Sequence, residues 1–114
     1  MSPEEHDRRL ADVSHLPHAI AAAMVLMQEE PSLQLAGKGF LDTTRIAGGD
    51  GALWRDIFLD NRDNVLASLS RMRDCMNRLV ELLDAQDGEA LTDWLNAAAR
   101  RREALLERRL REME

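Results

Sequence analysis

The sequence predicts an all-α fold, in which residues 1–114 form a single helical bundle. Aromatic residues make up only 4% of the chain, while the helix formers Ala, Leu, Met, Arg and Glu are abundant. Glycine and proline are scarce, at 6 and 3 residues, and many apolar residues recur three or four positions apart. A chain of 114 residues is long enough to bury one hydrophobic core, so we expect one modest domain.

The first half of the chain is expected to hold one long helix and a glycine-rich loop. Ser2 and Pro3 suit the N-cap and the first helical position, so a helix should start there and run to about Glu30, where Pro31 ends it. A short helical turn is expected over residues 32–36. The stretch "GKGFLDTTRIAGGDG" then holds five glycines, which predicts a loop with room for one helical turn.

The second half is expected to hold three helices, the last two of them long. Asp50 is placed to cap a helix through "ALWRDIFLD". A longer helix follows over residues 61–86, and Asp87 with Gly88 forms the next turn. A last helix runs from Glu89 to the end, where "ARRREALLERRLREME" is typical of a solvated, ion-paired helix surface.

The long helix carries the most regular apolar pattern of the chain. Six apolar residues alternate at spacings of four and three, as in the a and d positions of a helix–helix seam. They are Val65, Leu69, Met72, Met76, Leu79 and Leu83. Leu66 and Val80 widen this seam on one flank, which is typical of a helix buried in a bundle. Cys75 lies beside the seam and is expected to be a small buried hydrophobe.

Charge and cysteine content exclude several classes of partner. A formal net charge of −6, from 21 acidic and 15 basic residues, gives no general attraction to nucleic acid or to an anionic membrane. A single cysteine forms no internal disulfide, which fits a reducing compartment. The acidic start "MSPEEHDRR" is unlike a signal peptide, and the apolar run over residues 19–27 is too short to span a bilayer. We therefore expect a soluble cytoplasmic protein.

The opening helix shows two faces on a wheel drawn at about 100° per residue. The first face is expected to be core and holds His6, Leu10, Val13, Pro17, Ile20 and Met24. Asp7, Ser14 and His18 lie along one flank of it, as a line of polar, proton-exchanging groups. Pro17 removes one backbone donor and should kink the helix, as in a helix that frames a pocket. The alternative is that such a histidine is a hydrogen-bonded structural residue.

An arginine stands in the glycine-rich segment, within "DTTRIA". Its guanidinium suits the bidentate capture of a carboxylate, so Arg45 is a candidate for binding an anionic ligand. The alternative for Arg45 is a structural ion pair with Asp42 or Asp50. Trp54, on the next helix, is either core or a ligand contact.

The motifs of the sequence give little indication of a metal site or a nucleotide site. His15 and His18 have a spacing that can support a metal, but the sequence supplies no third ligand and no HExxH. No GxGxxG follows a strand, and neither a P-loop nor GxSxG occurs. We expect no metal site and no nucleotide site on this chain.

Two longer stretches resemble a known family. "HDRRLADVSHLPHAIAAAM" and "AGKGFLDTTRIAGGDGALWRDIFLDNRDNVL" are similar to the C-terminal helical domain of prephenate dehydrogenase and of its arogenate and cyclohexadienyl relatives. The resemblance runs from about Ser2 to Leu83. It implies an enzyme of tyrosine biosynthesis, which oxidatively decarboxylates prephenate to 4-hydroxyphenylpyruvate, or arogenate to tyrosine, and passes a hydride to NAD or NADP.

The resemblance also implies roles for individual residues. Arg45 would bind a substrate carboxylate, with His18 and Trp54 lining the cleft, and Asp42 would be a gating partner near the arginine. Four further residues belong to the matching motifs, namely His6, Asp7, Ser14 and His15. Gly39 would let the backbone approach the substrate, although Lys38 stands where many relatives have glycine.

The family pattern divides the enzyme into two parts. A Rossmann domain binds the nicotinamide and supplies the catalytic histidine, and the helical domain dimerises and closes the substrate cleft. This chain matches the second part only, so we expect no catalytic or cofactor residue on it, no activity alone, and a homodimer through the Val65–Leu83 seam. The competing hypothesis is a non-catalytic helical dimerisation or regulatory module, but a carboxylate-binding arginine together with His18 and Trp54 favours the first.

Overall fold

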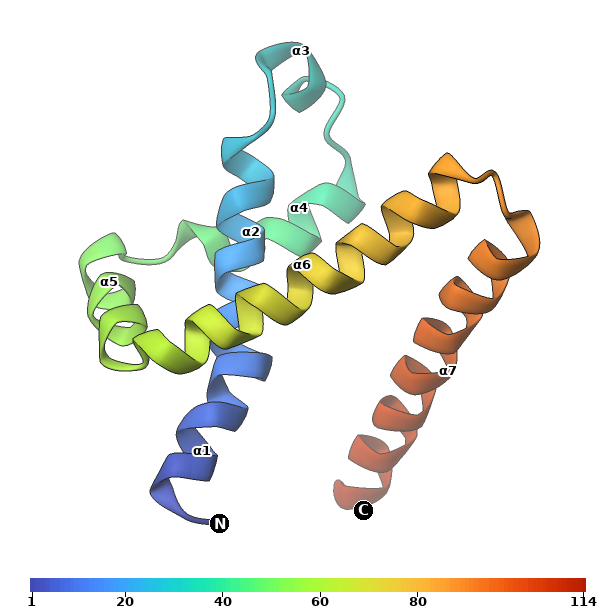
Figure 1. Ribbon diagram of the computed structural model, residues 1–114. Coiled ribbons are helices and arrows are strands. Elements are labelled where there is room, and N and C mark those ends of the chain that lie inside the picture. The colour runs from blue at the N-terminus through green and yellow to red at the C-terminus, as the bar shows by residue number, and fades with distance from the viewer. The chain divides into compact units, whose positions relative to one another are not determined.

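The computed structural model describes all of residues 1–114 and contains only helices. In chain order these are α1 (Pro3–Leu10), the π-helical turn η1 (Ala11–His15), α2 (Leu16–Leu26), α3 (Glu30–Leu33), α4 (Lys38–Thr44), the 3₁₀ turn η2 (Arg45–Gly48), α5 (Gly51–Asp60), α6 (Arg62–Asp84) and α7 (Gly88–Glu112) (Figure 1). The all-α prediction is confirmed. The chain divides into two compact units, Met1–Met72 and Arg73–Glu114, each of which is described by itself.

The opening helix is not continuous. Ser2 caps it as expected, accepting a hydrogen bond from the Glu5 amide at 3.1 Å. The π-helical turn η1 then interrupts it, because Pro17 has no N–H for a bond within the helix and the Leu16 N–H donates five residues back, to the Ala11 carbonyl. The kink expected at Pro17 therefore takes the form of a π turn before the proline. The predicted end at Glu30 is also wrong, since α2 ends at Leu26.

The π turn changes which residues of this helix face inward. Such a turn takes up one extra residue, so a wheel drawn at a constant angle loses register there. Val13, expected in the core, is 73% exposed, and Pro17 is exposed as well. The buried residues are instead Ala11, His15, His18 and Ala21. Of the predicted polar flank, His18 is buried, whereas Asp7 is exposed and Ser14 is half-buried.

Part of the apolar face that was expected in the core lines an open groove. Pro17, Ile20 and Met24 form one side of a cavity of about 300 Å³ within the first unit. Residues of α4, η2 and α6 complete it, among them Thr43 and Ile46.

The segment expected to be a loop is mostly helical, which corrects the prediction. Residues 38–44 form α4 and residues 45–48 form η2. The hydroxyls of Thr43 and Thr44 donate to carbonyls one turn back, each at 2.8 Å. Most of the glycines stand at helix ends, with Gly37 as the N-cap of α4, so they mark boundaries and do not break the helix. The neighbouring helix α3 begins at Glu30, two residues earlier than the turn predicted there.

The first unit is held together around α2 and the π turn. α2 packs against α4 and η2, and α4 lies beside it in Figure 1. The π turn is tied to α6 by Asp12, whose carboxylate accepts from the buried Ser68 hydroxyl and pairs with Arg71. Ser68 is only 1% exposed, so this polar contact lies inside the unit. Asp50 caps α5 as predicted, accepting from the Ala52 amide at 2.9 Å.

The second unit comprises the end of α6 and all of α7. The two long helices confirm the predicted pair, and they are joined by a tight turn in which Gln86 has a φ of 52°. Asp87 caps α7 by accepting from the Ala90 amide at 3.0 Å. Leu82 is the buried apolar residue of this unit. Cys75, expected to be buried, is exposed, which corrects that prediction.

Many apolar side chains of these two helices stay exposed in the single chain. On α6 they include Met76, Val80 and Leu83, at 44%, 60% and 57%. On α7 they are Leu95, Leu105, Leu106 and Leu110. No helix combines the length and the apolar character that crossing a bilayer requires.

Candidate functional site

Two helix faces meet in the first unit and bring four rings together. Ala11, His15 and His18 are spaced by four and three, so they share the inward face of η1 and α2. Trp54 and Phe58 are four apart on α5 and share a face in the same way. The rings of His15, His18, Trp54 and Phe58 are called the ring cluster below.

The closest contact in the ring cluster is the stack of His18 on Trp54. Their ring centroids are 3.8 Å apart and the planes differ by 16°. His15 meets Trp54 edge to face, at 6.3 Å and 81°, and Phe58 lies edge-on to both histidines. Aromatic and imidazole rings in these arrangements gain from both burial and ring electrostatics. The structure thus joins His15, His18 and Trp54, three of the predicted site residues.

Gly49 makes room for this stack. A Cβ on Gly49 would lie 3.0 Å from Trp54 Nε1 and 3.3 Å from His18 Cε1. The sequence drew attention to Gly39 instead, but Gly39 lies in the first turn of α4 with open space where a side chain would be. The sequence did offer one indication of Gly49, because it directly precedes the Asp50 cap and so lies in the link between η2 and α5.

Burial decides which nitrogen of His18 carries the proton. The residue is 7% exposed, and its Nδ1 is buried without a hydrogen-bond partner. An N–H buried without an acceptor is rare in folded proteins. A proton on Nε2 with a lone pair on Nδ1 avoids this penalty, so His18 carries its N–H donor at Nε2.

His15 has a hydrogen-bond partner that the sequence analysis missed. Asn61, at the C-terminal end of α5, places its amide nitrogen 3.2 Å from His15 Nδ1 and 2.7 Å from the Asp7 carbonyl oxygen. Burial lowers the pKa of His15, and the negative charge of Asp7 opposes this shift in part. Asn61 stands seven residues after Trp54, on the same helix face, and this spacing was the signal in the sequence.

Arg45 is free of the ion pairs considered for it. It begins η2, is exposed, and forms no ion pair within the chain. Asp42 pairs instead with Lys38 at 2.8 Å, and Asp50 is engaged in capping α5. The structure therefore does not bring Asp42 and Arg45 together. η2 packs against α2, which carries His18, so Arg45 extends from an element next to the ring cluster.

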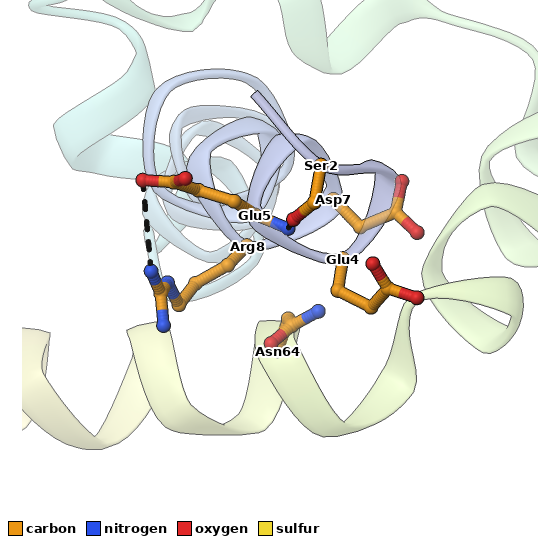
Figure 2. Close-up of a pocket in the computed structure, with 6 residues that line it drawn as sticks. All are labelled: Ser2, Glu4, Glu5, Asp7, Arg8 and Asn64. Carbon is orange, nitrogen blue, oxygen red and sulfur yellow. Dashed lines mark hydrogen bonds and ion pairs between the residues drawn. The ribbon is translucent and has the colours of Figure 1, made fainter.

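A second hollow lies along α1 and has the wrong charge for an anionic ligand. It has a volume of about 460 Å³ and is lined by Ser2, Glu4, Glu5, Asp7, Arg8 and Asn64. Figure 2 shows Asn64 of α6 facing the α1 side chains, with Arg8 paired to Glu5 at 3.8 Å. Of the remaining predicted residues, His6 is exposed on α1 and Ser14 is half-buried in η1, and neither contacts the ring cluster through a hydrogen bond.

Comparison with known proteins decides the family. Residues 2–97 match the family described as "prephenate dehydrogenase, dimerization domain". The chain belongs to this family.

Two relatives of this chain are dehydrogenases that are longer than the chain. The prephenate dehydrogenase of Bacillus subtilis is 33% identical over 92% of this chain and 30% of its own length. The cyclohexadienyl dehydrogenase of Zymomonas mobilis is 33% identical over 92% of this chain and 38% of its own length. The chain thus spans about a third of these relatives.

Two solved structures have a similar fold. Prephenate dehydrogenase from A. aeolicus, in complex with hydroxyphenyl propionate and NAD+, matches with a TM-score of 0.83 and 40% identity, over 92% of this chain and 39% of that one. Synechocystis arogenate dehydrogenase matches with a TM-score of 0.83 and 27% identity, over 92% of this chain and 41% of that one.

A Rossmann dinucleotide site needs a strand, a glycine-rich turn and a helix N-terminus, whereas this domain contains no strand and no GxGxxG. No group of three His, Cys, Asp or Glu side chains is placed to hold a metal ion. The ring cluster offers imidazole N–H donors and aromatic planes, and the neighbouring element η2 carries the exposed Arg45.

Proposed function

We propose that residues 1–114 are the substrate-binding and dimerisation domain of an NAD(P)-dependent prephenate dehydrogenase. The enzyme would oxidatively decarboxylate prephenate to 4-hydroxyphenylpyruvate. The observation that carries the proposal is the stack of His18 on Trp54, with Nδ1 of His18 buried, next to the element that bears the unpaired Arg45. The related A. aeolicus enzyme was solved with hydroxyphenyl propionate, in which a short chain joins a carboxylate to an aromatic ring.

The donor set suits an anionic cyclic substrate. Prephenate carries two carboxylates, one on its cyclohexadiene ring and one on its pyruvyl side chain, and arogenate shares the ring. A guanidinium binds a carboxylate through two parallel hydrogen bonds, and imidazole N–H groups add neutral donors. Flat ring walls fit the cyclohexadiene, because ligand sites combine apolar surface with a few placed polar groups. The role of this domain is then to bind and orient the substrate.

The hydride acceptor would be held by a Rossmann-type domain other than these residues. NAD or NADP would accept the hydride there. We therefore expect this chain alone to bind substrate without oxidising it. Mixing it with prephenate and NAD should give no NADH, and appreciable turnover would contradict the division of the enzyme into two parts.

A homodimer would cover the exposed apolar residues of α6 and α7. Met76 and Leu83 of the seam lie on α6, and the leucines of α7 from Leu95 to Leu110 add to this surface. Apolar surface of this extent on two successive helices is unusual in a monomer and marks an interface. The second unit buries little of its own, so a partner helix pair would supply most of its core.

Calorimetric titration with prephenate or hydroxyphenyl propionate tests the substrate site. Arg45→Ala should weaken binding by about tenfold or more, because a charged hydrogen-bond pair is lost. Arg101→Ala, which removes an exposed arginine of α7, is the matched control and should bind as the wild type does. Equal binding by all three proteins, or no binding by any of them, would contradict the proposal and favour a non-catalytic dimerisation module.

A further inference from the structure

The amide of Asn61 has only one orientation that its neighbours allow. Its terminal nitrogen lies 2.7 Å from the Asp7 carbonyl oxygen. A carbonyl oxygen only accepts hydrogen bonds, so the group facing it must be the NH₂ of the amide. The amide oxygen points the other way and accepts from Asn64 Nδ2 at 2.8 Å. Both ends of the Asn61 side chain are thereby assigned by their partners.

This orientation assigns the proton on His15. The same Asn61 nitrogen lies 3.2 Å from His15 Nδ1. An amide NH₂ has two hydrogens and donates only, so one hydrogen goes to the Asp7 carbonyl and the other to the imidazole. His15 Nδ1 must then be the acceptor, which leaves the proton of the neutral ring on Nε2.

The other groups around His15 do not reverse this assignment. α5 presents the uncharged rings of Trp54 and Phe58 to it. The charged group that acts on it is Asp7 of α1, and the pKa of His15 is nevertheless lowered, because burial outweighs that charge. His15 is 8% exposed, so a second proton on the ring would be poorly solvated.

We propose that Asn61 is a positioning residue that holds His15 as the neutral tautomer with its proton on Nε2, ready to donate to a carboxylate of the substrate. The link to a substrate rests on the proposed function, whereas the tautomer does not. The gain is that the ring presents a hydrogen-bond donor to the carboxylate and not a lone pair. Without Asn61 the ring is free to tautomerise and to turn a lone pair toward the substrate carboxylate, which would repel it. With Asn61 in place the ring offers only an N–H there.

Long-range ¹H–¹⁵N correlation spectra of the chain read the tautomer directly. In the wild type, His15 should show an unprotonated Nδ1 and a protonated Nε2. Asn61→Asp replaces the donor by a charged acceptor, so His15 should take a proton on Nδ1 and its pKa should rise by at least about one unit. Asn77→Asp adds the same charge on an exposed part of α6 and serves as the matched control, with a His15 spectrum like that of the wild type.

Several results would overturn the proposal. A wild-type His15 with its proton on Nδ1, or with both tautomers mixed, contradicts it without any variant. An Asn61→Asp spectrum equal to that of Asn77→Asp does so as well. If circular dichroism shows that Asn61→Asp does not fold, Asn61→Ala takes its place and should show mixed tautomers; an unchanged single tautomer in it would refute the role of Asn61.

Binding separates this proposal from the proposed function. Hydroxyphenyl propionate should bind Asn61→Asp at least about tenfold more weakly than Asn77→Asp. Equal affinity of these two variants would overturn the positioning role while the proposed substrate site stands. If the wild type does not bind this ligand at all, the proposed function and the substrate link fail, and the spectra still decide the tautomer.

Discussion

His18 and Trp54 stack face to face with 3.8 Å between their ring centroids, and this pair organises the candidate site. The π turn before Pro17 rotates His18 inward, and the Asp50 cap starts the helix that carries Trp54. Two local backbone features, one in each partner's element, therefore produce a single long-range contact.

Gly49→Ala should disrupt this stack. The new Cβ would lie 3.0 Å from Trp54 Nε1, so the indole or the backbone must shift. We expect a loss of about 1–3 kcal/mol of unfolding free energy, as is usual for an added methyl in a packed site. Gly48→Ala is the control, because its Cβ meets open space. Urea denaturation measures both, and equal stability of the two variants would contradict the crowding.

Asp12→Ala should loosen the π turn. The change leaves the buried Ser68 hydroxyl without its acceptor and Arg71 without its ion-pair partner. An unsatisfied buried hydroxyl costs about 1–3 kcal/mol. Asp63→Ala removes an exposed carboxylate of α6 and should change the unfolding free energy far less. Hydrogen exchange of the Leu16 amide, which closes the π turn, should accelerate in Asp12→Ala and stay unchanged in the control.

Stability should fall as the pH drops below the ordinary pKa of histidine. The pKa of His15 is lowered in the folded chain, so below about pH 6.5 the unfolded chain takes up a proton that the folded chain still refuses. The contribution of His15 is therefore fully present above that pH and is lost below it. His15→Gln removes the titrating group, so its unfolding free energy should depend less on pH between about pH 7.5 and about pH 5.5. If the unfolding free energies of the wild type and of His15→Gln depend on pH in the same way, His15 is not the source of the pH dependence.

The exposed leucines predict a dimer that a single charge can weaken. Sedimentation should show a dimer at micromolar concentration. Leu83→Glu places a carboxylate in the α6 seam and should shift the chain toward monomer, because a buried unpaired charge is costly. Leu59→Glu alters an equally exposed leucine of α5, outside that seam, and should leave the dimer intact. A wild-type monomer, or equal effects of both changes, would contradict an interface at α6.

The sequence predicted well those elements that depend on local signals. Asp50 and Asp87 are short polar residues that cap the following helix, and such caps act within one turn. The long seam predicted α6 because its apolar period extends over about five helical turns, from Val65 to Leu83. The prediction for the glycine-rich stretch was wrong because glycine occurs both in loops and at helix ends. The Leu41 amide donates to the Gly37 carbonyl, which shows that Gly37 stands at a helix end.

The sequence predicted several residues of the candidate site, but it did not predict the contacts between them. His15, His18 and Trp54 were found from motifs, but their contact depends on a π turn, whose single shifted hydrogen bond leaves no pattern in the sequence. Asn61 was missed because its role rests on a distance to His15 across the fold. Asp42 was expected beside Arg45, yet the lysine four residues before it is the partner that helix geometry offers.

The most direct test follows the two tryptophan indoles while ligand is added to the chain. Trp54 lies in the ring cluster, and Trp94 on α7 is an internal control. Addition of hydroxyphenyl propionate should shift the ¹H–¹⁵N signal of the Trp54 indole and leave that of Trp94 in place, with the shift weakened in Arg45→Ala. A shift of Trp94 alone, or of neither indole at saturating ligand, would contradict a carboxylate-binding site at His18 and Trp54.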